Sequence, residues 1–172
     1  MQNEEQKAED LANEVGTLAG RHRLDVAVAE SLTGGKIANQ LAAAEGSGEW
    51  FVGALVAYQT RVKHQVLHVP DGPVISEQSV VTMAEEVASL LQANASVAAS
   101  GAGGPGRQEG QEPGTTWIAV KVHDTVHTKQ YHFAGEPIEI LGQTQFHALA
   151  LLRSTIKSVY EASSNESAAP GG

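Results

Sequence analysis

Residues 29–35 read Ala-Glu-Ser-Leu-Thr-Gly-Gly and connect an apolar run at 24–29 to a helix-forming segment at 36–44. The apolar run contains β-branched residues, which favour a buried strand. The segment after it combines good helix formers with apolar residues at helical spacing. The stretch therefore predicts a strand that passes through a glycine-rich turn into a helix, the unit from which α/β proteins are built.

The turn itself contains side chains that can carry chemistry. Thr33 is predicted to be the N-cap of the helix, which would make Gly34 and Gly35 its first residues. The N–H groups of a first helical turn have no helical partner, so they can bind a phosphate, a carboxylate or a developing oxyanion. Ser31 would lie beside this anion site as a candidate nucleophile. The alternative is that the hydroxyl groups only stabilise the turn.

Composition limits the classes of protein to which the chain can belong. The 172 residues suit one domain with a substantial core, and the formal net charge of -9 without a basic run argues against a nucleic-acid partner. The chain has no cysteine, which excludes disulfides and thiolate chemistry. The acidic N-terminus does not resemble a signal peptide, and no apolar stretch is long enough to span a membrane. A cytoplasmic location is expected.

Strand and helix patterns alternate along the chain and end in one hairpin. This order predicts a three-layer α/β/α fold with a mixed sheet, mostly parallel, plus a C-terminal antiparallel hairpin. Residues 1–162 are expected to form a single domain, and 163–172 a disordered tail. Strands are expected at 24–30, 51–58, 95–100, 115–122 and 126–133, and helices at 4–20, 33–44, after 60, 76–94 and 138–161.

Ligands of such sheets bind where the first three strands end, and polar residues stand at these positions. Tyr58 ends the second strand, and Lys63 follows within a predicted short helix capped by Thr60. Both burial and the positive helix end would favour a neutral amine, which could act as the general base for Ser31. Tyr58 could relay the proton or hold the hydroxyl in place. The alternative is a solvated lysine and a packed tyrosine.

The third strand ends at Ser100 and leads into a glycine-rich loop at 101–106. Gly101, Gly103 and Gly104 would let the backbone approach a ligand, and the loop could form an anion nest. Its pattern matches neither the Walker loop nor the dinucleotide fingerprint. The alternative is a flexible turn.

A metal site is the other kind of site to consider. His64 and His68 are four residues apart, which would place both on one helix face, but Gln65 cannot serve as the base of a zinc protease. We therefore expect no metal and no cofactor.

Several motifs together resemble the CinA C-terminal domain family. They are residues 29–35, Gly46-Ser47-Gly48-Glu49-Trp50-Phe51, Val56-Ala57-Tyr58 with Lys63, Ile75-Ser76-Glu77, residues 99–105 and Pro113-Gly114-Thr115-Thr116-Trp117. The resemblance covers about residues 8–158. Characterised members hydrolyse the carboxamide of nicotinamide mononucleotide, giving nicotinic acid mononucleotide and ammonia.

The resemblance implies specific roles for three residues. Ser31 would be the nucleophile, with Lys63 and Tyr58 as the base and its partner. It also implies the stand-alone form of the domain, without the molybdopterin-binding-like domain that often precedes it. The expected partners are a small pyridine nucleotide and other copies of the chain in a homo-oligomer.

Two departures from the family pattern follow Phe133-Ala134-Gly135. Many members have arginine where this chain has Pro137 and Leu141. Two alternatives therefore stay open, namely a non-catalytic nucleotide-binding or assembly module of the same fold and an amidohydrolase for a different amide.

Overall fold

The computed structural model describes residues 2–167, and side chains over 5–164. Its single sheet has the strand order β2-β1-β3-β4-β5. The strands are β1 Val26–Glu30, β2 Phe51–Val56, β3 Ala95–Gly101, β4 Thr115–Val122 and β5 Thr125–His132. β1 pairs in parallel with β2 and β3, whereas β4 and β5 pair antiparallel to their neighbours. The mixed sheet with a C-terminal hairpin is thus confirmed.

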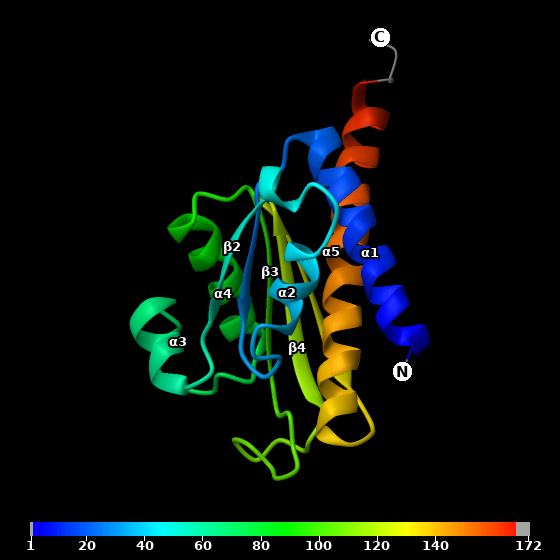
Figure 1. The fold of residues 1–172 in the computed structure, drawn as a ribbon. Helices are drawn as coiled ribbons and strands as arrows, with labels where there is room; N and C mark the ends of the chain where they lie inside the picture. Colours follow the sequence, from blue (N-terminus) through cyan, green and yellow to red (C-terminus); the bar gives the residue numbers. More distant parts are fainter. Residues whose placement is uncertain (1, 168–172) are drawn as a thin grey trace.

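Helices cover both faces of the sheet (Figure 1). They are α1 Gln2–His22, α2 Lys36–Ala42, α3 Thr60–Val66, α4 Glu77–Leu90 and α5 Pro137–Ser167, with a short 3-10 turn at Ser47–Glu49. α1, α2 and α5 pack on one face, where they share a core with Val28, Val97 and Val120. α4 packs on the other face against Ala29, Ala98 and Ala119. Because successive strand residues point to opposite faces, the same three strands supply both cores.

The face under α4 is lined by small side chains, which let this helix approach the sheet closely. Ser96 lies on this face, and its hydroxyl donates to the carbonyl oxygen of Ala84 in α4 at 2.6 Å. The helix begins as predicted at Ser76, whose side chain accepts a hydrogen bond from the Ser79 N–H. This cap fixes the start of α4 beside the end of β3.

Most predicted element ends differ from the structure by a few residues, as in Phe51–Val56 for 51–58, Lys36–Ala42 for 33–44 and Glu77–Leu90 for 76–94. α1 continues past Gly20 to His22. β2 is an edge strand whose residues alternate between half-buried and exposed, whereas a buried strand was predicted. β3 extends one residue further, to Gly101. α5 runs through Ser167, so residues 163–167 are helical instead of a disordered tail, and 168–172 lie outside the described residues. Among residues 2–167, no helix is long and apolar enough to cross a lipid bilayer.

Candidate active site

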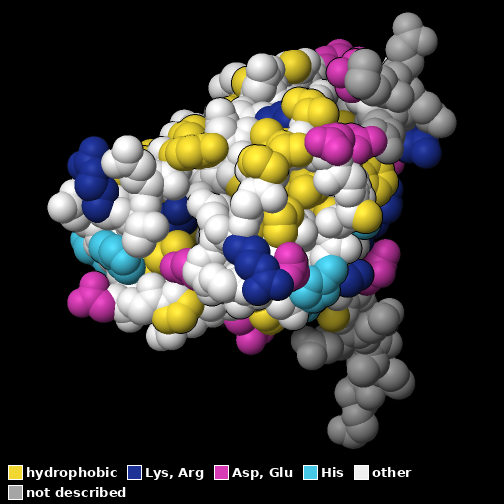
Figure 2. Space-filling view, turned by 90° about the horizontal axis from the view of Figure 1, so that it is seen from below, with side chains coloured by type: hydrophobic (Ala, Val, Ile, Leu, Met, Phe, Trp, Pro, Cys, Tyr) yellow, Lys and Arg dark blue, Asp and Glu magenta, His cyan; other side chains and the backbone are white. Residues whose placement is uncertain are grey.

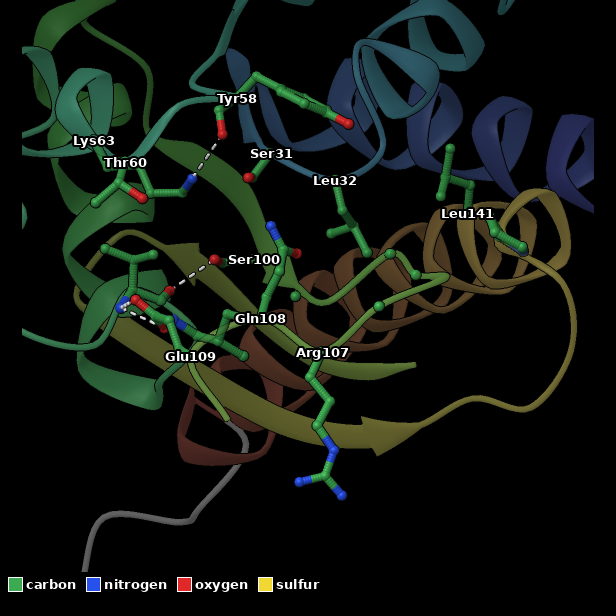
Figure 3. Close-up of a pocket in the computed structure, with 17 residues that line it drawn as sticks. Ser31, Leu32, Tyr58, Thr60, Lys63, Ser100, Arg107, Gln108, Glu109 and Leu141 are labelled. Atoms are coloured by element: carbon green, nitrogen blue, oxygen red, sulfur yellow. Dashed lines mark hydrogen bonds between the residues drawn. The ribbon is translucent and has the colours of Figure 1, made fainter. Parts of the chain in front are cut away.

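A cavity of about 560 Å³ opens where β1, β2 and β3 end (Figure 3). The parallel pairing of these strands brings their carboxyl ends to one edge of the sheet, which is where the sequence placed the site. The polar residues of the cavity wall are Ser31, Thr60, Lys63, Ser100, Arg107, Gln108 and Glu109. Helix α5 and the loop after β3 complete the wall, so one cavity combines five separate segments of the chain.

Ser31 is the first residue after β1. Its backbone N–H still bonds to the Ala99 carbonyl of β3 at 3.1 Å, so the sheet fixes its position. The residue is 6% exposed, and its hydroxyl lies at the cavity wall (Figure 3). Within residues 2–167, this hydroxyl forms no hydrogen bond to another residue. It is therefore available to a molecule that enters the cavity.

Lys63 reaches the same cavity from α3 and is 2% exposed. Its Nζ donates to the backbone carbonyl oxygen of Tyr58 at 3.3 Å. Burial lowers the pKa of Lys63 below 10.5, while the negative charge of Glu109 raises it. The lowered pKa increases the fraction of neutral amine, the form that can accept a proton.

The cause of this pKa shift differs in part from the sequence prediction. The N-cap of α3 is Gln59 rather than Thr60, and the helix is only seven residues long. Lys63 therefore belongs to its last turn, where the helix end favours a cation. Burial, and not the positive end of the helix, lowers the pKa.

Tyr58 also lines the cavity, and it contacts Lys63 through its backbone. The residue is 67% exposed, and its ring points away from Lys63 (Figure 3). The carbonyl oxygen, in contrast, accepts the hydrogen bond from Lys63. The structure therefore assigns contact with the lysine to the main chain of Tyr58 rather than to its phenol.

The predicted anion site at the start of α2 is wrong. The N-cap is Gly35, in a left-handed conformation, and the helix begins at Lys36. The carboxylate of Glu30 already occupies this helix end, accepting from the N–H groups of Ile37 at 3.1 Å and Ala38 at 2.9 Å. An anion at the N-terminus of a helix is favourable, and here the protein supplies its own.

Thr33 belongs to the same arrangement. Its hydroxyl donates to Glu30 Oε2 at 2.5 Å instead of capping the helix. Thr33, Gly34 and Gly35 line a separate surface depression beside α5, which Glu5 and Gln145 also border. The Gly34 N–H donates to the Ser31 carbonyl oxygen at 3.0 Å, but these three predicted binding residues line a different depression from the Ser31 side chain.

The predicted binding residues at the end of β3 and in the loop after it do line the cavity. They are Ser100, Gly101, Gly103 and Gly104. The Ser100 hydroxyl donates to the carbonyl oxygen of Val74 at 2.7 Å, so it supports the opposite wall. Hydrophobic side chains of Leu32 and Leu141 lie over Gly103.

Sequence reasoning missed the hydrophobic wall and the role of Glu109. Leu32, Pro137 and Leu141 form the hydrophobic wall, and Pro137 is the first residue of α5, where its missing N–H is tolerated. Figure 2 views the strand-end face of the molecule and shows hydrophobic side chains gathered on it. Glu109 accepts hydrogen bonds from the N–H groups of Val74 and Ile75. Its place in a polar loop gave no signal of this contact.

The histidine pair does not lie on one helix. α3 ends at Val66, so His68 is beyond it, with a positive φ of 50°. His64 Nδ1 contacts the Val69 carbonyl oxygen at 2.7 Å, and His68 Nδ1 contacts Glu86 Oε2 at 2.6 Å. Within the part of the chain that the structure describes, no group of three or more His, Asp or Glu side chains could hold a metal ion.

The fold and cavity define an α/β domain with a serine and a buried lysine at the strand ends. The chain belongs to the CinA C-terminal domain family, whose model matches residues 8–156.

Relatives and solved structures agree with this assignment. A protein named as competence-damage inducible from Lactiplantibacillus plantarum is 34% identical over 140 residues, covering 78% of this chain and 33% of that protein. A CinA-like protein from Cytophaga hutchinsonii is 34% identical over 158 residues, covering 88% and 38%. This chain therefore spans about a third of the length of these relatives.

Two crystal structures of CinA superfamily proteins have the same fold. The protein from Enterobacter cloacae has a TM-score of 0.84 at 27% identity, covering 87% of this chain and 92% of the other. The protein from Escherichia coli has a TM-score of 0.81 at 31% identity, covering 85% and 89%.

Proposed function

We propose that this domain hydrolyses the carboxamide of nicotinamide mononucleotide to nicotinic acid mononucleotide and ammonia, with Ser31 as the nucleophile. The observation that carries the proposal is the presence of the Ser31 hydroxyl and a buried lysine in one cavity. The choice of substrate follows from membership of the family. The cytoplasm stays the expected compartment, and a homo-oligomer the expected assembly.

The chemistry begins with proton transfer. Neutral Lys63 accepts the proton of Ser31 as the hydroxyl oxygen attacks the amide carbon. The negative charge then develops on the former carbonyl oxygen, which requires a hydrogen-bond donor. The N–H of Leu32 follows the nucleophile and has no partner within residues 2–167, so we assign this role to it. It replaces Gly34 and Gly35, which line another depression.

Collapse of this intermediate breaks the carbon–nitrogen bond. The Lys63 ammonium gives its proton to the leaving nitrogen, so that ammonia departs and an ester to Ser31 remains. A water molecule then attacks the ester carbon while neutral Lys63 accepts its proton. The Lys63 ammonium returns this proton to the Ser31 oxygen as the acid leaves.

Ammonia release by the purified protein tests the proposal. Nicotinamide mononucleotide is the first substrate, and Ser31→Ala should abolish turnover. Lys63→Met should lower kcat by at least about a hundredfold, the usual scale for loss of a general base. The matched controls are Ser89→Ala and Lys157→Met, both at exposed helix positions, and these should keep normal turnover. Near-normal turnover by Ser31→Ala would refute the proposal. Thermal stabilisation by the nucleotide without turnover would instead favour a binding module.

A second candidate is hydrolysis of a different amide, one without a phosphate group, which the hydrophobic wall favours. Among the described residues, the charged side chains that line the cavity are Lys63, Arg107 and Glu109. Arg107 contacts the carboxylate of Glu112, so a phosphate would compete with that carboxylate.

Leu141→Arg separates the two candidates. The new cation should raise kcat/KM for the mononucleotide relative to the corresponding riboside if the wild-type wall disfavours phosphate. An unchanged ratio, together with a wild-type preference for the mononucleotide, would remove the second candidate.

A further inference from the structure

We propose that Glu109 is a positioning residue for Lys63, because its carboxylate ties the loop at 107–112 to the backbone at 74–75 and so fixes the cavity wall around the lysine. This inference rests on the proposed function, since it assigns a supporting residue to the same general base. Glu109, Val74 and Ile75 all line the cavity together with Lys63 (Figure 3).

The backbone at Glu109 has an unusual conformation. Gln108 and Gln111 exchange two backbone hydrogen bonds, of 3.2 and 2.8 Å, around a two-residue turn. Both central residues have positive φ, 51° at Glu109 and 75° at Gly110, as in a type I′ turn. Such positions favour glycine, asparagine or aspartate over glutamate. A side chain at a disfavoured φ is held by its surroundings, and such positions often lie at functional sites.

Hydrogen bonds to the carboxylate of Glu109 hold this residue in place. The Val74 N–H donates to both carboxylate oxygens at 3.0 Å, and the Ile75 N–H donates to Oε2 at 2.9 Å. On the other side, Ser100 donates to the Val74 carbonyl oxygen at 2.7 Å. The segment at 74–75 is therefore held both by the end of β3 and by the loop. Hydrogen bonds to an ionised acceptor are about twice as strong as neutral ones.

The same carboxylate acts on Lys63 through its charge. It opposes the effect of burial and raises the pKa of Lys63. The other cation lining the cavity, Arg107, contacts Glu112. When Lys63 takes the Ser31 proton, the resulting ammonium is attracted by the negative charge of Glu109 in the same cavity. This charge stabilises the protonated lysine while the tetrahedral intermediate exists.

Two variants distinguish the effect of the Glu109 carboxylate from the effect of its backbone conformation. Glu109→Gly relieves the backbone but removes both the charge and the hydrogen bonds. Glu109→Gln removes the charge and one of the two acceptor oxygens, and its remaining oxygen can still accept the two bonds that Oε2 receives. Glu85→Gln is the control, since it makes the same charge change at an exposed position on α4 that does not line the cavity.

Three measurements test the inference. In Glu109→Gly, amide exchange at Val74 and Ile75 should accelerate at least about tenfold, the scale for losing a hydrogen bond to a charged group. In both Glu109 variants, the pH at which kcat/KM reaches half its maximum should fall, because removal of the negative charge lowers the pKa of Lys63. kcat/KM at high pH should fall about tenfold in Glu109→Gly, since a displaced catalytic group loses rate. Glu85→Gln should match the wild type in all three.

The inference can fail independently of the proposed function. If the wild type releases no ammonia, amide exchange still reports the hydrogen bonds from Val74 and Ile75 to Glu109. NMR titration of isotope-labelled Lys63 still reports the effect of the Glu109 charge on its pKa. Wild-type exchange at Val74 and Ile75 in Glu109→Gly, or an unchanged Lys63 titration in both Glu109 variants, would overturn it. If exchange and titration change as expected but the wild type has no turnover, only the proposed hydrolysis is refuted.

Discussion

The carboxylate of Glu30 lies beneath the first turn of α2 and is fully buried. It accepts three hydrogen bonds, from the Thr33 hydroxyl and from the N–H groups of Ile37 and Ala38. Glu30→Ala removes the acceptor and leaves two backbone donors at a helix end without a partner. Each hydrogen bond to a charged group contributes about 1.5–3 kcal/mol, and water entering the space would recover part of this. We expect a loss of about 3–5 kcal/mol in the free energy of unfolding.

Urea unfolding followed by circular dichroism measures this change. The control is Glu85→Ala, an exposed position on α4, where a surface substitution should change stability by less than about 0.5 kcal/mol. Glu30→Gln should fall between the two, because its amide oxygen still accepts from one donor. A loss below about 1 kcal/mol in Glu30→Ala would show that the buried carboxylate does not stabilise the start of α2.

Three further predictions concern the cavity and its frame. Hydrolysis of the amide should need neutral Lys63, so kcat/KM should be low at acidic pH and rise with pH, with its midpoint below pH 10.5 because burial lowers the pKa of Lys63. A rate that does not rise with pH would contradict the lysine role. Tyr58→Phe should change kcat by less than about threefold, because it removes only the hydroxyl of an exposed ring and keeps the backbone carbonyl that binds Lys63. A hundredfold loss in the ammonia assay would show that the hydroxyl takes part. Gly114→Ala should lower the free energy of unfolding in urea by more than about 3 kcal/mol, since φ is +90° and a Cβ would overlap the Phe133 carbonyl oxygen. Wild-type stability would contradict the close approach of Gly114 to Phe133.

The sequence predicted the elements of the fold better than their ends. Hydrophobic periodicity located each strand and helix, and Ser76 marked the start of α4 because its cap depends only on local residues. The start of α2 was wrong because the deciding contact comes from Glu30, a residue that looked like the end of a strand. Once a buried carboxylate occupies the helix end, Thr33 bonds to it, and the glycines adopt positive φ.

The candidate site was predictable only where strand ends determine it. Ser31 and Ser100 stand directly after or at the end of parallel strands, so the fold class alone brings them together. Tyr58 shows the limit of this reasoning, because strand order does not say whether a side chain or a carbonyl faces the cavity. Glu109 shows it again, since its contact with Val74 spans 35 residues and depends on the path of a loop.

The parts of the cavity differ in how firmly the fold holds them. Ser31 follows β1, an interior strand of the sheet, whereas Pro137, Leu141 and the 107–112 loop come from segments outside the sheet. Replacement of these outer segments would leave the anchored serine undisturbed. Under the proposed function, a change of substrate would therefore need changes only at the rim of the cavity, while the nucleophile keeps its place.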